Sequence, residues 1–140
     1  MSEIYKRYLH LKIKNSQKFY LFKCGIFFIF IDEDARIMSN VLNLKLVKLN
    51  TVILKCGFPI NSLNKYMSIL NNLNYDVEIV DNQYDTTLSY NSYTNISKLK
   101  SLMTEIAYTK IDSLSISQAY DFLYKIQDNI IEYLQNDNCN

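Results

Sequence analysis

The sequence has very little glycine and proline: Gly25, Gly57 and Pro59 are the only such residues among 140. Average usage would give about ten glycines and about seven prolines. A phosphate-binding loop of the form G-x-x-x-x-G-K-[ST] needs two glycines five residues apart, which Gly25 and Gly57 cannot provide. The chain therefore has no P-loop of its own, and the glycine-rich collagen, propeller and dinucleotide-binding folds are excluded. No nucleotide partner is expected.

Metal-ligating residues are also scarce. The chain has one histidine and three cysteines, Cys24, Cys56 and Cys139, with no C-x-x-C pair. This set does not support a zinc site, so we expect no metal and no cofactor. Cys24 and Cys56 lie in apolar segments, which predicts buried free thiols in a reducing compartment.

Targeting and membrane signals are missing as well. The N-terminal sequence MSEIYKRYLH lacks the apolar core of a signal peptide, and the apolar run 25–31 is too short to span a bilayer. We therefore expect an intracellular, cytoplasmic protein with no membrane partner.

Charge is nearly balanced overall, at +1, but it is unevenly distributed. Residues 1–55 contain ten Lys and Arg against four Asp and Glu, whereas residues 56–140 contain five against ten. Any contact with nucleic acid is therefore expected in the first half of the chain. The alternative is charge pairing between the two halves.

Hydrophobic periodicity predicts an α/β fold, in which helices flank a small mixed sheet of about five strands and a helical hairpin follows. Helices are expected over residues 3–14, 32–42 and 61–73, and strands over residues 18–24, 27–31, 43–48, 51–56 and 76–80. The predicted domain organisation is an α/β domain over 1–84, a linker or edge strand over 85–97, a helical hairpin over 98–135 and a tail over 136–140.

The hairpin carries its own signals. Ser115 and Gln118 form the pattern of a capping box at the start of the second helix. Each helix has an apolar stripe that must dock, either on the first domain or on another chain. The second helix thus supplies candidates for self-association with a protein partner or in a homo-oligomer: Ala119, Phe122, Leu123, Ile126 and Ile130.

Residues 4–83 resemble the mismatch-recognition domain at the N-terminus of the DNA mismatch-repair protein MutS. The resemblance rests on a series of motifs: Tyr8-Leu9-x-Leu11-Lys12, Leu21-Phe22-Lys23-Cys24-Gly25-x-Phe27-Phe28, Phe30-Ile31-x-Glu33-Asp34-Ala35-Arg36, Leu42-Asn43-Leu44-x-Leu46, Lys55-Cys56-Gly57-Phe58-Pro59, Tyr66-Met67 and Val77-Glu78-Ile79-Val80-Asp81. Both glycines and the proline lie on motif positions. The resemblance implies the MutS domain I fold and duplex DNA as a possible partner, and therefore a location associated with DNA.

A second, weaker resemblance lies in the hairpin. The segment 112–119, with Tyr124-Lys125-Ile126, looks like the helix-turn-helix at the end of the MutS ATPase domain, although Ile116 replaces the helix-opening proline of the family. In the family that segment contributes to dimerisation. The connector, lever, clamp and ATPase regions have no counterpart here.

The residues that recognise a mispaired base in the family are only partly kept. The family motif Phe-x-Glu corresponds to Phe27-Phe28-Ile29, so the phenylalanine is present and isoleucine replaces the glutamate. An isoleucine cannot hydrogen-bond a displaced base. Phe27 can be read as a retained minor-groove wedge or as a residue of an apolar core or interface strand.

Basic residues could contact phosphates, or could form an ordinary solvated basic surface. If DNA binding is retained, the candidate residues are Phe27, Lys23, Lys45 and Lys48, with Lys12, Lys14, Lys18 and Lys55 as possible further phosphate contacts. His10 has no catalytic partner at a plausible spacing and is predicted to lie on the surface. No acid pair or nucleophile–base set is present, so we expect no enzyme.

Two functional hypotheses follow. The first is a non-enzymatic, MutS-derived module reused as a scaffold for protein–protein assembly or recruitment. The second is an accessory protein that binds duplex DNA through the basic first half, with weak or no mismatch preference. The burial of Phe27 and Ile29 bears directly on the choice between them.

Overall fold

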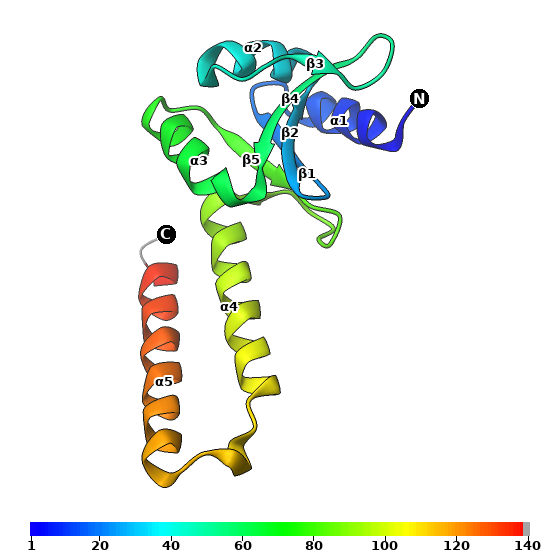
Figure 1. Ribbon diagram of the computed structural model, residues 1–140. Coiled ribbons are helices and arrows are strands. Elements are labelled where there is room, and N and C mark those ends of the chain that lie inside the picture. Colours follow the sequence, from blue (N-terminus) through cyan, green and yellow to red (C-terminus); the bar gives the residue numbers. More distant parts are fainter. Residues whose placement is uncertain (139–140) are drawn as a thin grey trace. The chain divides into compact units, whose positions relative to one another are not determined.

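The computed structural model describes the backbone of residues 1–138 and the side chains of residues 1–135. The chain divides into two compact units, Met1–Tyr90 and a second that begins at Asn91 (Figure 1). The first unit is an α/β sheet domain and the second is a helical hairpin, which confirms the predicted fold class. No helix in this described part is long and apolar enough to cross a lipid bilayer.

The first unit holds a six-stranded mixed sheet with the strand order β3-β4-β2-β1-β5-β6. Its elements, in chain order, are α1 (Glu3–Lys14), β1 (Phe19–Cys24), β2 (Phe27–Ile31), α2 (Asp32–Leu42), β3 (Val47–Lys48), β4 (Leu54–Pro59), the 3-10 turn η1 (Ile60–Ser62), α3 (Leu63–Asn72), β5 (Val77–Val80) and β6 (Leu88–Ser89). β1 runs parallel to β5, and every other neighbouring pair is antiparallel.

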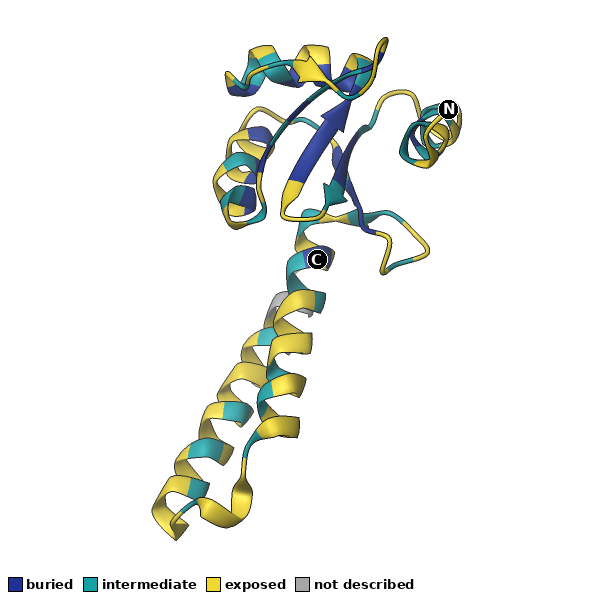
Figure 2. Cartoon of the chain, turned by 45° about the vertical axis from the view of Figure 1, so that its right-hand side comes forward, coloured by how far each residue is buried: buried dark blue, intermediate teal, exposed yellow. Residues whose placement is uncertain are grey.

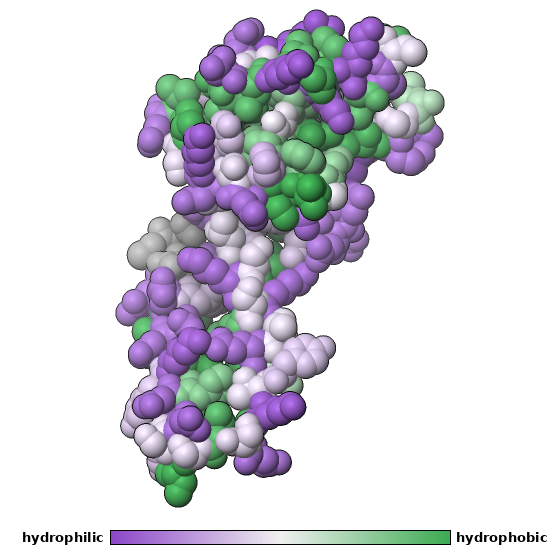
Figure 3. All heavy atoms as spheres, viewed as in Figure 1, coloured by the Kyte–Doolittle hydropathy of each residue, from purple (hydrophilic) through white to green (hydrophobic). Residues whose placement is uncertain are grey.

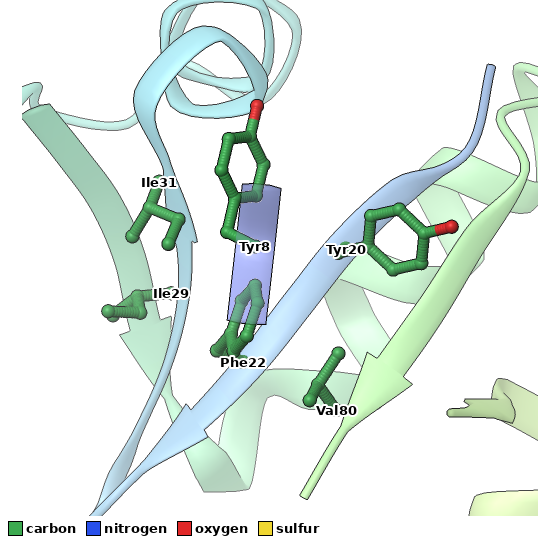
Figure 4. Packing of buried hydrophobic residues seen from close by; sticks show 6 residues of the cluster. All are labelled: Tyr8, Tyr20, Phe22, Ile29, Ile31 and Val80. Carbon is green, nitrogen blue, oxygen red and sulfur yellow. The ribbon is translucent and has the colours of Figure 1, made fainter. Parts of the chain in front are cut away.

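Alternation along the central strands gives the sheet two buried faces. One face packs against α1 through a cluster that the close-up in Figure 4 shows in sticks: Tyr8, Tyr20, Phe22, Ile29, Ile31 and Val80. On the other face, Phe58 stacks on Tyr66 of α3, with 4.4 Å between ring centroids. Cys56 on the same face lies 3.5 Å from the Ala35 carbonyl oxygen of α2. The sheet is thus covered on both sides, and its central strands are dark blue in Figure 2.

A buried carboxylate joins α1, α2 and the sheet. Asp34 is only 1% exposed and lies 2.9 Å from the Lys12 ammonium. Its other oxygen accepts a 3.0 Å hydrogen bond from the Tyr20 backbone N–H, and the Tyr8 hydroxyl lies 3.4 Å from Asp34 Oδ1. Burial is the largest effect on this group, and it raises the pKa of Asp34 above the ordinary aspartate value despite these partners.

The second unit contains α4 (Tyr90–Tyr108), a short 3-10 turn η2 (Ile111–Ser113) and α5 (Ile116–Asn138). The predicted capping box is confirmed. The Gln118 backbone N–H donates to Ser115 Oγ at 3.1 Å, and the Ser115 N–H donates to Gln118 Oε1 at 2.9 Å. Lys125 of α5 forms a 2.7 Å ion pair with Glu105 of α4.

Several element boundaries differ from the sequence prediction. The segment 85–97 contains a two-residue edge strand, Leu88–Ser89, and from Tyr90 onward it is helix, where a linker or longer edge strand was expected. β3 spans only Val47–Lys48, where a strand over 43–48 was predicted. β4 spans Leu54–Pro59, where a strand over 51–56 was predicted. Of the predicted tail 136–140, α5 includes the backbone up to Asn138, while Cys139 and Asn140 lie outside the described residues.

Candidate nucleic-acid interface

The tip of the β1–β2 hairpin is a tight turn at Gly25 and Ile26, and we call residues 24–27 the hairpin tip. Gly25 has φ +59°, a left-handed conformation that glycine adopts without steric cost. The Ile26 carbonyl accepts a 2.9 Å hydrogen bond from the Ile60 backbone N–H, which ties the turn to the segment after β4. The tip is therefore held by the strands on both sides of β2.

Phe27 is the exposed residue of an otherwise buried strand. Its side chain is 45% exposed, whereas the other four residues of β2 are all buried. In the strand register it lies between Cys24 on β1 and Pro59 on β4. Ile26, beside it, is 68% exposed. Phe27 is thus a surface residue and not part of the core, which leaves an apolar pair projecting at the hairpin tip.

Ile29 lies two residues further on and is a core residue. It is 6% exposed and belongs to the cluster that packs under α1 (Figure 4). Its register partner on β4 is Gly57, and a β-carbon built on Gly57 would clash with the Phe28 carbonyl oxygen and lie 2.7 Å from Ile29 Cγ2. The missing side chain at Gly57 therefore makes room for Ile29. A group at this position cannot reach a DNA base without a change of packing.

A pocket of about 500 Å³ opens beside the hairpin tip, between α1 and the ends of β1 and β5. We call it the basic pocket. Its polar and charged lining residues are Glu3, Lys6, Arg7, His10, Lys23 and Asn82. Cys24 also lines it and lies opposite Phe27 in the register, so the pocket and the exposed ring are neighbours.

Carboxylates partly neutralise the basic pocket, and an amide binds one of its cations. Lys23 Nζ lies 3.8 Å from an Asp81 carboxylate oxygen, and Lys6 lies 2.9 Å from Glu3. Arg7 donates a 2.9 Å hydrogen bond to the Asn82 side-chain oxygen. The pocket keeps an excess of positive charge, but a small one, so any phosphate contact there is weak and salt-sensitive.

Other candidate lysines are placed elsewhere. Lys12 is paired with buried Asp34, and Lys18 forms a 2.7 Å ion pair with Glu78, so both contribute to the fold. Together with Lys23–Asp81, the Lys18–Glu78 pair joins the basic first half of the chain to the acidic second half. The alternative of internal charge pairing therefore holds for part of the basic set.

Lys45 and Lys48 are exposed but do not gather at the hairpin tip. Lys48 lies on β3, which pairs with β4 next to the Lys55–Ile31 register pair. Ile31 is at the opposite end of β2 from Phe27, about 13 Å along the strand. The structure therefore brings Lys23 to Phe27 and leaves Lys45 and Lys48 at the far end of the sheet.

Sequence reasoning missed the contribution of α1 to this site. Lys6, Arg7 and His10 lie within one turn of each other, so they share one side of the helix. That spacing was a usable signal, but only the packing of α1 on the sheet shows that this side lines a pocket together with Lys23. His10 is exposed, as predicted, and lines the pocket.

Metal and thiol chemistry have little support at this site. Within the described part of the chain, no group of three His, Cys, Asp or Glu residues could hold a metal ion. Cys56 is buried, and burial raises the pKa of its thiol to about 11. Cys24 is only half-buried, and burial also raises its pKa. Neither thiol is activated as a nucleophile.

The self-association candidates on α5 lie on two different faces. Ala119, Phe122 and Ile126 are half-buried. Leu123 is 60% exposed and Ile130 is 40% exposed. The sequence suggested one apolar stripe, but the structure divides its residues between a half-buried face and an exposed face of α5.

Comparison with known proteins agrees with this fold. The model of the MutS domain I family matches residues 2–111. The DNA mismatch repair protein MutS of Rickettsia africae is 33% identical over 84 residues, which cover 57% of this chain and 9% of that protein. The MutS proteins of Thermotoga petrophila and Thermotoga neapolitana are 30% and 32% identical over 89 residues, which cover 64% of this chain and 11% of each. The chain thus spans about a tenth of the length of these relatives.

Proposed function

The chain belongs to the MutS domain I family, and from that premise we propose that it binds duplex DNA through Phe27 without a base-specific hydrogen bond. One observation carries the proposal: Phe27 is 45% exposed at the hairpin tip, while the rest of β2 is buried. An apolar side chain inserted between base steps kinks a duplex, and the cost is lowest where stacking is already poor. Ile26 adds apolar surface beside the ring.

The proposed DNA binding does not include discrimination between bases. Ile29 replaces the glutamate and is buried under α1, so it can neither donate to nor accept from a base. Any preference for mismatched DNA then comes only from how easily the duplex bends at the mismatch. We expect affinities for matched and mismatched duplexes to differ by less than about threefold.

Phosphate contacts are assigned to the basic pocket. Lys6, Arg7 and Lys23 line it next to the hairpin tip, so they can meet the backbone beside an inserted Phe27. About three phosphate contacts weaken binding roughly 40-fold between 50 mM and 200 mM salt. The location proposed for the chain is therefore an intracellular compartment that contains DNA.

Fluorescence anisotropy with matched, mismatched and single-insertion duplexes tests this function. Phe27→Ala is expected to weaken binding at least tenfold in 50 mM salt. Ile37→Ala on α2 is the matched control, since Ile37 is 43% exposed but lies on another element, and it should change binding by less than twofold. Equal loss in both variants, or no binding up to about 100 μM, would contradict the proposal.

A second function, non-enzymatic protein–protein assembly, is favoured by the second unit. Seven large apolar side chains of α5 are at least 40% exposed, which is the kind of surface that binds a partner: Ile116, Tyr120, Leu123, Tyr124, Ile130, Ile131 and Leu134. The helix-turn-helix resemblance of this segment remains a prediction, because residues 112–140 lie outside the family match. Neither proposed function includes a catalytic or nucleotide-binding step.

Hydrogen exchange tests the assembly role. If a partner binds the hairpin, it stabilises α5. Amide exchange along α5 should then be slower when the dilute chain is placed in concentrated cell extract. The amides of β1 and β2 serve as the internal reference and should not change. Unchanged exchange in α5, both in extract and at high concentration of the pure chain, would contradict assembly.

A further inference from the structure

The hairpin tip is a tight turn with two adjacent apolar side chains at its end. Gly25 has φ +59°, whereas Ile26 does not have a positive φ, which is the pattern of a type II′ turn. The register pair Cys24–Phe27 closes the turn, and the Ile26 carbonyl is bonded to the Ile60 N–H. Backbone hydrogen bonds therefore hold Ile26 and Phe27 on a short, stiff support.

Both side chains are exposed at the end of a buried strand. Ile26 is 68% exposed and Phe27 is 45% exposed, and together they present roughly 200 Å² of surface. The dark blue strand in Figure 2 has a yellow start for this reason, and Figure 3 shows hydrophobic residues at the surface of the first unit. The tip is thus an apolar wedge of two side chains.

The side chains of the tip offer a base almost no hydrogen bonding. Gly25 has no side chain, and Ile26 and Phe27 are apolar. The Cys24 thiol forms only weak hydrogen bonds. Pro59, which lies beside Phe27 on β4, has no backbone N–H. The cations of the basic pocket lie on the other side of Cys24, where they are assigned to phosphates.

This composition makes a mispaired base a poor ligand. When an apolar wedge displaces a base, the donors and acceptors of that base leave water, and each group that stays unpaired is costly. Ile29, at the position of the family's glutamate, is 6% exposed and cannot supply a partner. The weak stacking of a mismatch is therefore offset by the cost of its unpaired base edge.

An abasic site avoids that cost. Its backbone is continuous but one base is missing, so the stack is already interrupted and no base has to be displaced. Successive bases of a strand are about 3.4 Å apart, which is the thickness of an aromatic ring. The Phe27 ring can therefore occupy the gap and stack on the neighbouring bases. Ile26 is branched and cannot stack, so it would pack on the sugar at the edge of the gap.

The charge beside the wedge suits the phosphates of the interrupted strand. Lys6, Arg7 and Lys23 line the basic pocket next to the tip. Arg7 is bonded to the neutral amide of Asn82, and this bond leaves the charge of the guanidinium in place. The first unit thus presents apolar surface for the gap and positive charge for the backbone side by side.

We propose that the hairpin tip recognises a missing base: the preferred ligand is duplex DNA with an abasic site, where Phe27 fills the gap and Ile26 covers the adjoining sugar. This inference rests on the proposed DNA-binding function and is independent of assembly.

Fluorescence anisotropy of the full chain in 50 mM salt tests the preference. One duplex sequence is used in four forms: matched, mismatched, nicked, and with the tetrahydrofuran analogue of an abasic site. The abasic duplex should bind at least fivefold tighter than the matched duplex, and the mismatched duplex within about threefold of it. The nicked duplex is the control for bending, since it is flexible but keeps every base, and should bind within about twofold of the matched duplex.

Two variants test the assigned side chains. Phe27→Ala should remove the preference, so that the abasic and matched duplexes bind within about twofold of each other. Ile26→Ser should weaken binding of the abasic duplex about threefold. Val52→Ser is its matched control, because Val52 is 80% exposed in the loop between β3 and β4, and it should change binding by less than about 1.5-fold. Circular dichroism verifies that each variant keeps its helix content.

A preference below fivefold, or a nicked duplex bound as tightly as the abasic one, would overturn the inference. If binding of the matched duplex still falls in Phe27→Ala, the DNA-binding function stands and only the abasic preference is wrong. If the wild type binds none of the four duplexes up to about 100 μM, both are wrong. Equal effects of Ile26→Ser and Val52→Ser would overturn the assignment of Ile26.

Discussion

At the scale of the residue, position 29 decides how far this chain follows its family. Ile29 is 6% exposed and packs over Gly57, in a cluster that α1 closes (Figure 4). Restoring the family's glutamate would place a carboxylate among the apolar side chains of this cluster. The loss of the recognition group is therefore coupled to packing and cannot be reversed by one substitution.

Ile29→Glu is expected to lower the free energy of unfolding by about 4 kcal/mol, because it buries a charge among apolar side chains. Guanidinium denaturation followed by circular dichroism measures the change. Ile29→Val is the control and should cost about 1 kcal/mol, since it removes one methylene. An Ile29→Glu chain within 1 kcal/mol of the wild type would mean that solvent reaches this position.

Asp34 should leave a signature in the pH dependence of stability. Because burial raises its pKa in the folded state, the folded chain binds the Asp34 proton more tightly than the unfolded chain. Its stabilising contribution is complete below the ordinary aspartate pKa of about 3.9 and is lost as pH rises through the raised value.

Asp34→Asn isolates this contribution. The difference in unfolding free energy, wild type minus variant, should fall as pH increases from about 3 to 6, as measured by urea denaturation at each pH. A difference that stays level or rises would contradict a raised pKa. Asn40→Ser, at an exposed position of α2 without an ionisable group, is the control and should show no such fall.

At the scale of the element, the capping box sets where α5 begins. Ser115 and Gln118 satisfy each other's backbone N–H groups, at 3.1 Å and 2.9 Å. The helix that follows begins at Ile116, which is also the first of its exposed apolar side chains. The isoleucine in place of the family's proline leaves this cap intact.

Ser115→Ala should destabilise the start of α5 by about 1 kcal/mol, because one backbone donor loses its acceptor. Amide exchange in the first turn of α5 is then expected to accelerate about fivefold, as measured by NMR. Ser117→Ala, inside the same turn, should leave exchange within twofold. Equal effects of the two substitutions would show that the cap does not stabilise the helix.

At the scale of the whole molecule, the two proposed functions belong to different units. Apart from Tyr93, every buried hydrophobic residue of the described chain lies in the first unit. The candidate DNA contacts belong to that unit as well, whereas the exposed apolar side chains of α5 belong to the second. The two proposed functions can therefore be separated by dividing the chain.

A fragment of residues 1–90 is expected to fold on its own and to bind duplex DNA within about twofold of the full chain. Its own core and all six strands are complete. Thermal unfolding followed by circular dichroism should be cooperative, and sedimentation should show a monomer. A fragment without a cooperative transition would mean that the second unit is needed for the fold.

The sequence predicted the first unit well where alternation and turn residues were strong. α1 and β2 have the predicted bounds, and Gly25 turns the hairpin as expected. The prediction failed over residues 90–97, which are helical. This segment has no charged residues and no clear apolar stripe. Its many Ser, Asn and Thr residues are also weak helix formers. The helix there could not be recognised from periodicity.

The sequence predicted the chemistry of individual residues of the candidate site, but not which residues the fold brings together there. The sequence alone determined that position 29 cannot hydrogen-bond a base, that the chain has no P-loop and that Phe27 follows a tight turn, because these depend on side-chain chemistry and local backbone. Only the tertiary structure decided that Phe27 is exposed and Ile29 buried, that Arg7 and His10 line one pocket with Lys23, and that the apolar side chains of α5 lie on two faces. Those outcomes depend on which surfaces α1 and α4 cover, and coverage is set by packing between segments that are distant in the chain.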